Sequence, residues 1–385
     1  MNLKVPFVDL APLQAEIADE LDVAWRDVVA GCAYIGGPFV ERFERQWAAY
    51  CDTAYAVGVA NGTDAIQLAL RALGFGPGDE VVVPTNTFVA TAEAVVAVGA
   101  EPRFADVDPN TLLLTSESLS TAIGPRTAAV VVVHLYGQPA DMDTLCDVAS
   151  RAGIAVVEDA AQAHGATWRG RKAGSFGQIG CFSFYPGKNL GAFGDAGAIV
   201  TDDHVLAERI RMLGNHGRSA SSNSVHKVVG VNSRLDGLQA AVLSAKLPRL
   251  DGWTRDRRRV AESYRRELAG APLAFVEEHQ DACGVYHLMI ARTPDRDNVR
   301  QWLGDQGIAT GVHYPAPCHF QEAFRQFRKE PLPVAERAAR EIISLPMFPH
   351  LTDSSIERVC QEIREFSRML RPVRRRPTKE AEVVQ

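Results

Sequence analysis

Cysteine is scarce in this chain, and no two cysteines stand in a CxxC pair. Structural zinc sites are normally built from such pairs, and small secreted domains depend on even sets of bonded cysteines. The seven cysteines here are odd in number and widely scattered. We therefore expect a cytoplasmic protein in a reducing compartment, without a bound metal. The cysteines are Cys32, Cys51, Cys146, Cys181, Cys283, Cys318 and Cys360.

Long apolar runs and a surplus of basic charge are also missing. The longest apolar runs have the length of a β-strand, so no membrane-spanning segment is predicted. Asp9 and Pro12 interrupt the N-terminus before an apolar run could serve as a signal peptide. The 41 Lys and Arg residues face 47 Asp and Glu, a formal net charge of −6. We expect neither a membrane nor a nucleic acid as a partner.

Short β-branched runs alternate with helical patterns between about residues 55 and 200. EVVVP, AAVVVVHLYG and IAVVED are typical of buried strands, and TDAIQLALRALG shows the three-and-four spacing of a helix. This order predicts an α/β domain with a large, mainly parallel sheet. Beyond about residue 235, helical material with a break at Pro248 leads into a smaller α+β unit. The predicted division is an N-terminal arm and large domain over 1–250, a small domain over 251–370, and a disordered tail over 371–385.

Asp159 ends the apolar run IAVVED, and so lies at the carboxyl end of a buried strand, where open α/β sheets bind ligands. A half-buried carboxylate becomes neutral unless a cation or hydrogen bonds keep it ionised. A protonated pyridine nitrogen is one such cation. The alternative is that Asp159 caps a following helix, AAQAHGA.

Lys188 follows 29 residues later, in CFSFYPGKNLGAFGDAGA. An apolar strand precedes it and three glycines follow, so its amine is expected to be desolvated or approached closely by a ligand. Desolvation lowers the pKa of a lysine and makes it a nucleophile toward an aldehyde. The alternative is a solvated loop lysine beside a turn.

A strand also runs into Gly62 and Thr63 and then into a helix, in VGVANGTDAIQLAL. The N–H groups at a helix start can hold a phosphate, and Ser183 could add a hydroxyl. Simple helix capping by Thr63 or Asp64 is the alternative. Phe88, in PTNTFVATAEAV, follows another strand, where an aromatic ring either stacks on a flat cofactor or belongs to the core.

With these residues in view, the chain resembles the sugar aminotransferases of the DegT/DnrJ/EryC1/StrS family, which have the aspartate aminotransferase fold (fold type I). The resemblance covers nearly the whole chain. Its most specific stretches, in the expected order, are NGTDAI, PTNTFVATAEAV, VEDAAQAHGA, GCFSFYPGKNLGAFGDAGA, GVNSRLDGLQAA and HYPAPCH.

The resemblance implies pyridoxal 5'-phosphate as the cofactor. It implies that Lys188 binds the cofactor as a Schiff base and serves as the catalytic acid and base, that Asp159 pairs with the pyridine nitrogen, and that Phe88 stacks on the ring. Gln162 is expected on the other side of the ring.

The same resemblance implies that Gly62, Thr63 and Ser183 hold the cofactor phosphate. Asn232, in GVNSRLD, is expected to reach the phosphate of a neighbouring subunit's cofactor. The implied unit is a homodimer with shared active sites.

The reaction implied is transfer of an amino group from L-glutamate to a keto carbon of a dTDP-linked 6-deoxyhexose. Related dehydratases have His in place of the lysine, so Lys188 favours transamination. The stretch SFYPGKNLGA looks most like members that aminate carbon 3, whereas members that act on carbon 4 more often have His at the position of Tyr185.

We expect Tyr185, His313 and Tyr314 to lie nearest to the substrate, with loop packing as the alternative for all three. Arg218 and Lys227 are candidates for binding its pyrophosphate. A protein that binds the cofactor or a sugar nucleotide without turnover, acting in regulation, is the competing hypothesis. A protein that only binds a ligand does not need a lysine that is deprotonated as readily as Lys188. The residue therefore favours the enzyme hypothesis over the binding-protein hypothesis.

Overall fold

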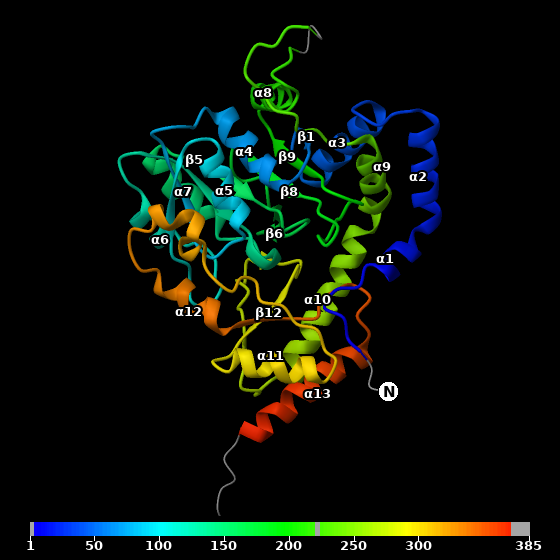
Figure 1. Cartoon of the computed structure of the whole chain (residues 1–385), viewed down its shortest axis with the longest axis vertical. Helices are drawn as coiled ribbons and strands as arrows, with labels where there is room; N and C mark the ends of the chain where they lie inside the picture. The colour runs from blue at the N-terminus through cyan, green and yellow to red at the C-terminus, as the bar shows by residue number, and fades with distance from the viewer. Residues whose placement is uncertain (1–3, 220–223, 371–385) are drawn as a thin grey trace, which may run out of the picture.

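The structure is a computed structural model that describes residues 4–219 and 224–370. A seven-stranded sheet forms the centre of the larger part of the molecule (Figure 1). Its strand order is β1-β9-β8-β5-β4-β2-β3, and β9 runs antiparallel to both of its neighbours while β8, β5, β4, β2 and β3 are parallel. The prediction of a large, mainly parallel sheet is confirmed. The predicted tail over 371–385 lies outside the described residues.

The α-helices are α1 (Ala11–Glu16), α2 (Ala18–Ala30), α3 (Pro38–Tyr50), α4 (Gly62–Leu73), α5 (Val89–Ala97), α6 (Ser116–Ala122), α7 (Met142–Ala152), α8 (His204–Gly214), α9 (Gly237–Lys246), α10 (Leu250–Glu267), α11 (Arg296–Asp305), α12 (Pro333–Glu341) and α13 (Asp353–Leu370). The strands are β1 (Tyr55–Val59), β2 (Glu80–Pro84), β3 (Glu101–Ala105), β4 (Thr127–Val133), β5 (Ala155–Asp159), β6 (Thr167–Trp168), β7 (Arg171–Lys172), β8 (Ile179–Ser183), β9 (Gly197–Thr201), β10 (Ala274–Phe275), β11 (Ala282–Cys283), β12 (Met289–Arg292) and β13 (Ile342–Leu345). Short 3-10 helices are η1 (Leu135–Gly137), η2 (Leu247–Arg249), η3 (Cys318–Phe320) and η4 (Glu322–Phe327).

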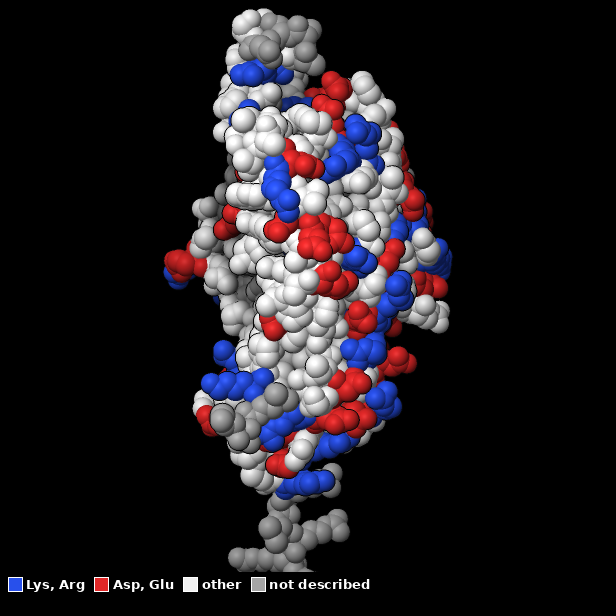
Figure 2. Space-filling view, turned by 90° about the vertical axis from the view of Figure 1, so that its right-hand side faces the viewer, with Lys and Arg blue, Asp and Glu red and all other residues white. Residues whose placement is uncertain are grey.

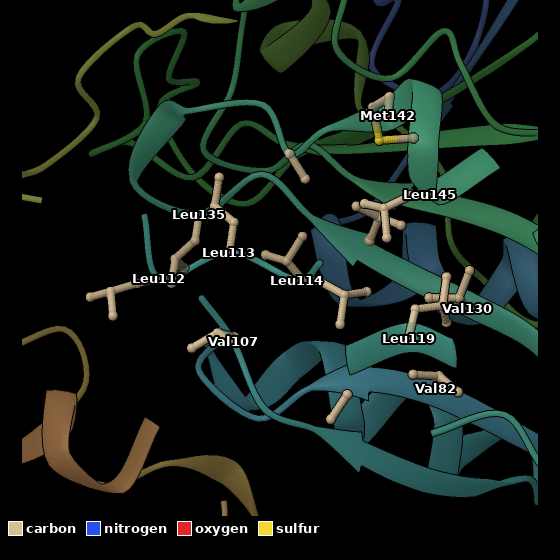
Figure 3. Close-up of a cluster of buried hydrophobic side chains, with 14 of the residues drawn as sticks. Val82, Val107, Leu112, Leu113, Leu114, Leu119, Val130, Leu135, Met142 and Leu145 are labelled. Atoms are coloured by element: carbon tan, nitrogen blue, oxygen red, sulfur yellow. The ribbon is translucent and has the colours of Figure 1, made fainter. Parts of the chain in front are cut away.

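The central strands are mostly apolar because helices cover both faces of the sheet. Along β2 and β4, Val82 and Val130 point into one hydrophobic cluster, while Val81 and Val131 point into a second cluster on the opposite face. Figure 3 shows the first cluster, in which Val82 and Val130 pack with leucines of the 112–119 segment and with side chains of α7. This double burial keeps the strand ends, and the residues that follow them, in fixed positions.

Helix α10 leads out of the large sheet region toward a smaller unit (Figure 1). The 3-10 turn η2, which contains Pro248, separates α9 from α10, at the predicted break. The smaller unit contains the sheet β10-β12-β13, with α10, α11 and α13 packed around one cluster. Residues of α12 and η4, however, contact the large-sheet side. The segment that contains η4 and α12 therefore contributes to the large-sheet side, although it follows residue 250. We keep the division into two domains near residue 250 as a proposal.

The chain after Asp159 forms turns instead of a helix over residues 160–166. Capping of a following helix is therefore not the role of Asp159. Among residues 4–219 and 224–370, no helix is long and apolar enough to cross a membrane. Within the same ranges, no cluster of His, Cys, Asp and Glu side chains has the composition of a metal site.

Candidate active site

A cavity of about 800 Å³ opens at the carboxyl ends of the central strands. Asp159 ends β5 and Ser183 ends β8, and both line this cavity. The start of α4 closes one side, and His313 and Tyr314 of the later part of the chain close another. Parallel strands bring their carboxyl ends to one edge, which is why residues more than a hundred positions apart meet here.

Asp159 and Lys188 are the two charged groups at the centre of the cavity's sheet side. The Asp159 carboxylate is 8% exposed and accepts two hydrogen bonds, from Thr91 Oγ1 at 2.8 Å and from the Ala161 N–H at 3.1 Å. These donors hold the carboxylate in place and leave further lone pairs for a cationic partner. This is the environment that a protonated ring nitrogen requires.

The Lys188 amine is buried and makes no hydrogen bond with any residue in the described part of the chain. Burial lowers the pKa of Lys188 from its usual 10.5 to about 8, against the opposing effect of the Asp159 charge. A turn fixes the backbone at Lys188, because the Lys188 N–H donates to the Tyr185 carbonyl oxygen at 2.8 Å. The amine is therefore deprotonated more easily than an exposed lysine and has no competing polar partner.

The turn at the start of α4 lies directly against the end of β8. Asn61 caps the helix by accepting the Asp64 N–H at 2.8 Å, so Gly62 and Thr63 occupy its first turn. A Cβ atom added to Gly62 would lie 2.6 Å from the Ser183 Cβ, so only glycine allows this approach. Backbone N–H groups and two hydroxyls therefore converge on one small volume, which suits a phosphate.

His164 supports Ser183 from behind the cavity. Its Nε2–H donates to the Ser183 carbonyl oxygen at 2.8 Å, and burial, with the nearby Lys188 charge, lowers the pKa of His164 to about 3. The imidazole is therefore neutral near pH 7 and acts as a fixed donor.

Gln162, Tyr314 and Phe88 line the cavity as a connected group. The Gln162 side chain accepts the Tyr136 N–H at 2.7 Å and donates to the Tyr314 hydroxyl at 3.1 Å, so its orientation is fixed at both ends. The Phe88 ring is half exposed and lies 5.5 Å from the Tyr314 ring, centroid to centroid. An exposed ring at a cavity wall is available to stack on a planar ligand.

Tyr185 and His313 also line the cavity, as predicted for residues near the substrate. Tyr185 is 59% exposed. His313 Nδ1 lies 2.8 Å from the Ser344 hydroxyl oxygen, and burial together with the Lys188 charge lowers the pKa of His313. These residues offer polar groups on the side of the cavity away from the sheet.

Three predicted residues do not line this cavity. Asn232 pairs with Asn215 in an isolated bridge, and Arg218 pairs with His226 in another. Lys227 bonds through its N–H to the Gly217 carbonyl oxygen. This segment follows α8 and projects from the top of the molecule in Figure 1. Within the described part of one chain, none of these three residues belongs to the cavity lining.

Two residues that sequence reasoning missed, Arg257 and His287, line the cavity as well. His287 Nδ1–H donates to the Asn189 side-chain oxygen at 3.1 Å, next to Lys188. Arg257 lies in α10 among several other arginines. The apolar spacing of α10 places residue 257 on its buried face, and this was the only signal available.

The residues present fit pyridoxal phosphate. A buried amine without a polar partner suits its aldehyde, a buried carboxylate with spare lone pairs suits its ring nitrogen, and the narrow turn at Gly62 suits its phosphate.

Comparison with known proteins agrees with this chemistry. A dTDP-3-amino-3,4,6-trideoxy-alpha-D-glucose transaminase of Streptomyces venezuelae is 47% identical over 367 residues, covering 94% of this chain and 96% of the relative. A UDP-N-acetyl-3-dehydro-alpha-D-glucosamine 3-aminotransferase of Acidithiobacillus ferrooxidans is 44% identical, covering 94% and 98%.

Solved structures show the same fold. DesV of S. venezuelae, in complex with a ketimine intermediate, matches with a TM-score of 0.92 at 47% identity, covering 94% of this chain and 98% of that one. NtdA of Bacillus subtilis, with bound cofactor PMP, matches with a TM-score of 0.89 at 32% identity, covering 95% and 85%. The fold is therefore that of the pyridoxal-phosphate aminotransferases.

The family model matches residues 15–364, which include every residue of the cavity except Phe7 and Val8. The match extends through α10 and most of α13, so it covers both units of the molecule. This protein is a pyridoxal-phosphate-dependent aminotransferase and belongs to the DegT/DnrJ/EryC1/StrS aminotransferase family.

Proposed function

We propose that the protein transfers an amino group from L-glutamate to carbon 3 of a dTDP-linked 3-keto-6-deoxyhexose, giving a dTDP-3-amino sugar. The observation that carries this proposal is the 47% identity over almost the full length to a transaminase named for a dTDP-3-amino sugar. The relative from A. ferrooxidans also bears carbon 3 in its name but carries UDP. Both relatives therefore support amination at carbon 3, whereas only the first supports dTDP as the nucleotide carrier.

When bound, pyridoxal phosphate supplies an aldehyde that exchanges amines and a ring that accepts electrons. The Asp159 carboxylate, held by Thr91 and Ala161, would hold the ring nitrogen and keep it protonated. The free Lys188 Nζ would accept a proton from the substrate carbon and donate it to the cofactor carbon. Its pKa of about 8 suits both roles near neutral pH.

The remaining cavity residues position the reactants. The N–H groups at Gly62 and Thr63, with the Ser183 hydroxyl, bind the phosphate, and the neutral His164 holds Ser183 in place. Phe88 would stack on the ring, and Gln162, fixed between Tyr136 and Tyr314, would contact the ring as well. We assign these two roles because Phe88 and Gln162 line the cavity.

Tyr185, His313 and Tyr314 bind and orient the sugar in this proposal. Tyr185 is the most exposed of the three and lies three residues before Lys188, so its hydroxyl can reach a sugar bound next to the amine. His313 is held by Ser344 and is neutral at pH 7, because burial lowers its pKa.

We further propose a homodimer in which Asn232, Arg218 and Lys227 reach the partner's cofactor phosphate and substrate pyrophosphate. Large apolar side chains on and after α2 support an interface, since Trp25 is 56% and Ile35 57% exposed. Figure 2 views the side where α2 lies in Figure 1 and shows an area without charged side chains. Exposed large apolar side chains are typical of association sites. All seven cysteines are free thiols, which supports our proposal of a cytoplasmic location.

The decisive experiment incubates the holoenzyme with L-glutamate labelled at its nitrogen and with dTDP-3-keto, dTDP-4-keto or UDP-linked 3-keto sugars in separate reactions. We expect the label at carbon 3 of the dTDP product, located by NMR. Lys188→Ala serves as the matched inactive control. An amine found only at carbon 4, or only with the UDP sugar, would refute the proposal.

A further inference from the structure

A second cavity of about 380 Å³ adjoins the first, and Lys188 and Arg257 line both. Its other walls are the N-terminal segment around Asp9, the loop over 186–193, the end of α9 with Lys246, and Trp253 of α10. A ligand in this second cavity can therefore reach the Lys188 amine.

Arg257 is a buried cation with one unused hydrogen-bond donor group. It is 5% exposed, and its Nη1 donates to the carbonyl oxygens of Tyr286, His287 and Met347 at 3.1, 3.4 and 3.3 Å. Nε is fully enclosed and has no partner, while Nη2 bonds to no described residue. Nη2 is therefore the guanidinium group left for a ligand, and a carboxylate is a strong acceptor for a charged N–H donor.

No carboxylate in the described ranges forms an ion pair with Arg257 or with Lys246. Burial lowers the pKa of Arg257 to about 10, so it stays charged at neutral pH. A buried charge without a counter-ion is strongly unfavourable, and a bound anion removes that cost.

Lys246 is the second cation of this cavity. It is 4% exposed, its Nζ donates to the Gly191 carbonyl oxygen at 2.7 Å, and the amine lies 4.5 Å from the centroid of the Phe193 ring. Burial lowers its pKa to about 8. Only one of its three N–H donors is used by the protein, which leaves two for a ligand.

The cavity thus holds three basic side chains, Lys188, Lys246 and Arg257, and a single carboxylate, Asp9. Asp9 already accepts the Ala11 N–H at 3.0 Å. This charge balance favours an anionic ligand. Because Arg257 and Lys246 are two separate cations without a counter-ion, a ligand with two anionic groups fits best.

We propose that Arg257 and Lys246 bind the two carboxylates of the amino donor, a dicarboxylic amino acid, with the α-carboxylate on Arg257 and the side-chain carboxylate on Lys246. The order follows from position. The α-carboxylate is attached to the reacting carbon, which must lie beside Lys188, and Arg257 lines both cavities with it; Lys246 lines only the outer one. The inference rests on the proposed amino transfer and specifies its donor.

The test separates the two halves of the reaction in the holoenzyme. The donor half starts from the pyridoxal phosphate form and is followed by its absorbance on addition of L-glutamate or of its neutral isostere, L-glutamine. The sugar half starts from the pyridoxamine phosphate form and a dTDP-keto sugar. Arg257→Gln should weaken apparent affinity for both amino acids by about 30-fold or more, and leave the sugar half unchanged.

Lys246→Met should weaken affinity for L-glutamate by about tenfold but leave L-glutamine unaffected, so that the preference for glutamate disappears. Arg258→Gln and Lys172→Met are the matched controls. Arg258 also donates to carbonyl oxygens from α10, and Lys172 also lies over an aromatic ring, but neither lines a cavity. Both controls should behave as wild type.

Binding of glutarate, which has both carboxylates but no amine, gives a readout without turnover. Calorimetry should detect binding to wild-type holoenzyme and at least tenfold weaker binding to Lys246→Met. If Arg257→Gln does not fold, this comparison and the glutamate-to-glutamine ratio of Lys246→Met still decide the matter.

Wild-type affinity for L-glutamate in the folded variants would overturn the inference, as would weakening of the sugar half by Arg257→Gln, since the cations would then serve the nucleotide pyrophosphate. A wild-type enzyme that accepts glutamate but aminates no dTDP sugar would instead overturn the proposed function and leave this inference standing.

Discussion

Glu158 and Asp159 are consecutive residues of β5, and both carboxylates are buried, but they lie on opposite faces of the sheet. Glu158 accepts four hydrogen bonds, from the N–H groups of Gly174, Phe176 and Gly177 and from His134 Nε2, all within 2.8 Å. Asp159 accepts two and faces the cavity.

The hydrogen bond from His134 completes the set of donors around the Glu158 carboxylate. The His134 Nδ1 accepts the Ala140 N–H, so its Nε2 carries the proton that it donates to Glu158. Every lone pair of Glu158 that the geometry offers is used by the protein, whereas Asp159 has capacity left over. A saturated carboxylate stabilises the fold, and an unsaturated one is available for a ligand.

The largest effect should come from Asp159→Asn. The amide can still accept from Thr91 or Ala161, so the fold is retained, but it carries no charge to hold a proton on the ring nitrogen. We expect amino transfer to fall by about 10²–10³-fold, the loss produced by removing one electrostatic stabiliser. Single-turnover kinetics measure this, and a thermal melting temperature within a few degrees of wild type confirms folding. Near-normal turnover would contradict the role of Asp159.

The neighbouring substitution, Glu158→Gln, should act on stability instead. It removes the charge and turns an N–H donor toward the backbone donors of Gly174–Gly177, so we expect a loss of about 3 kcal/mol or more in the free energy of unfolding. Urea unfolding of the cofactor-free protein measures this, with the exposed Glu357→Gln as control. Unchanged stability would show that the four bonds to Glu158 contribute little.

Lys188→Met should stabilise the cofactor-free protein at pH 7, by about 1–3 kcal/mol. The folded-state pKa of Lys188 is lowered from 10.5 to about 8, so below pH 8 the native state carries a buried charge. Between pH 8 and 10.5 the unfolded chain binds the extra proton, and wild-type stability rises with pH. The advantage of the variant should therefore shrink over this range in melting experiments. An advantage independent of pH would mean that burial of the charge is not its cause.

Gly62→Ala should have the smallest effect of the four. The new Cβ would meet the Ser183 Cβ at 2.6 Å and displace one side of the phosphate turn. We expect cofactor binding to weaken by about 1 kcal/mol, close to fivefold in Kd. Equilibrium dialysis with pyridoxal phosphate measures this, and Gly304→Ala, which meets no atom within 4 Å, is the control. Equal affinities in the two variants would argue against the phosphate turn.

The central sheet was predictable because its strands are buried on both faces and therefore read as unbroken β-branched runs. Asp159 ends β5 and Lys188 follows β8 by five residues, and both line the same cavity, so the sequence placed them at the same edge of the sheet. The strands of the smaller unit were harder to predict, because β10 has two residues and β12 four. The register of β12 depends on pairing with β13, whose paired residues lie 50 to 56 positions further along the chain, and β10 pairs in turn with β12.

The amino-acid sequence by itself determined the fold class and the cofactor, because local runs and short motifs carry that information. Only the tertiary structure decided which of the arginines in RDRRR faces the cavity. Arg255 and Arg259 are exposed, Arg258 is half-buried, and Arg257 is buried. The physical reason is that carbonyl oxygens of residues 286, 287 and 347 orient its guanidinium, and their position depends on how distant segments pack against α10.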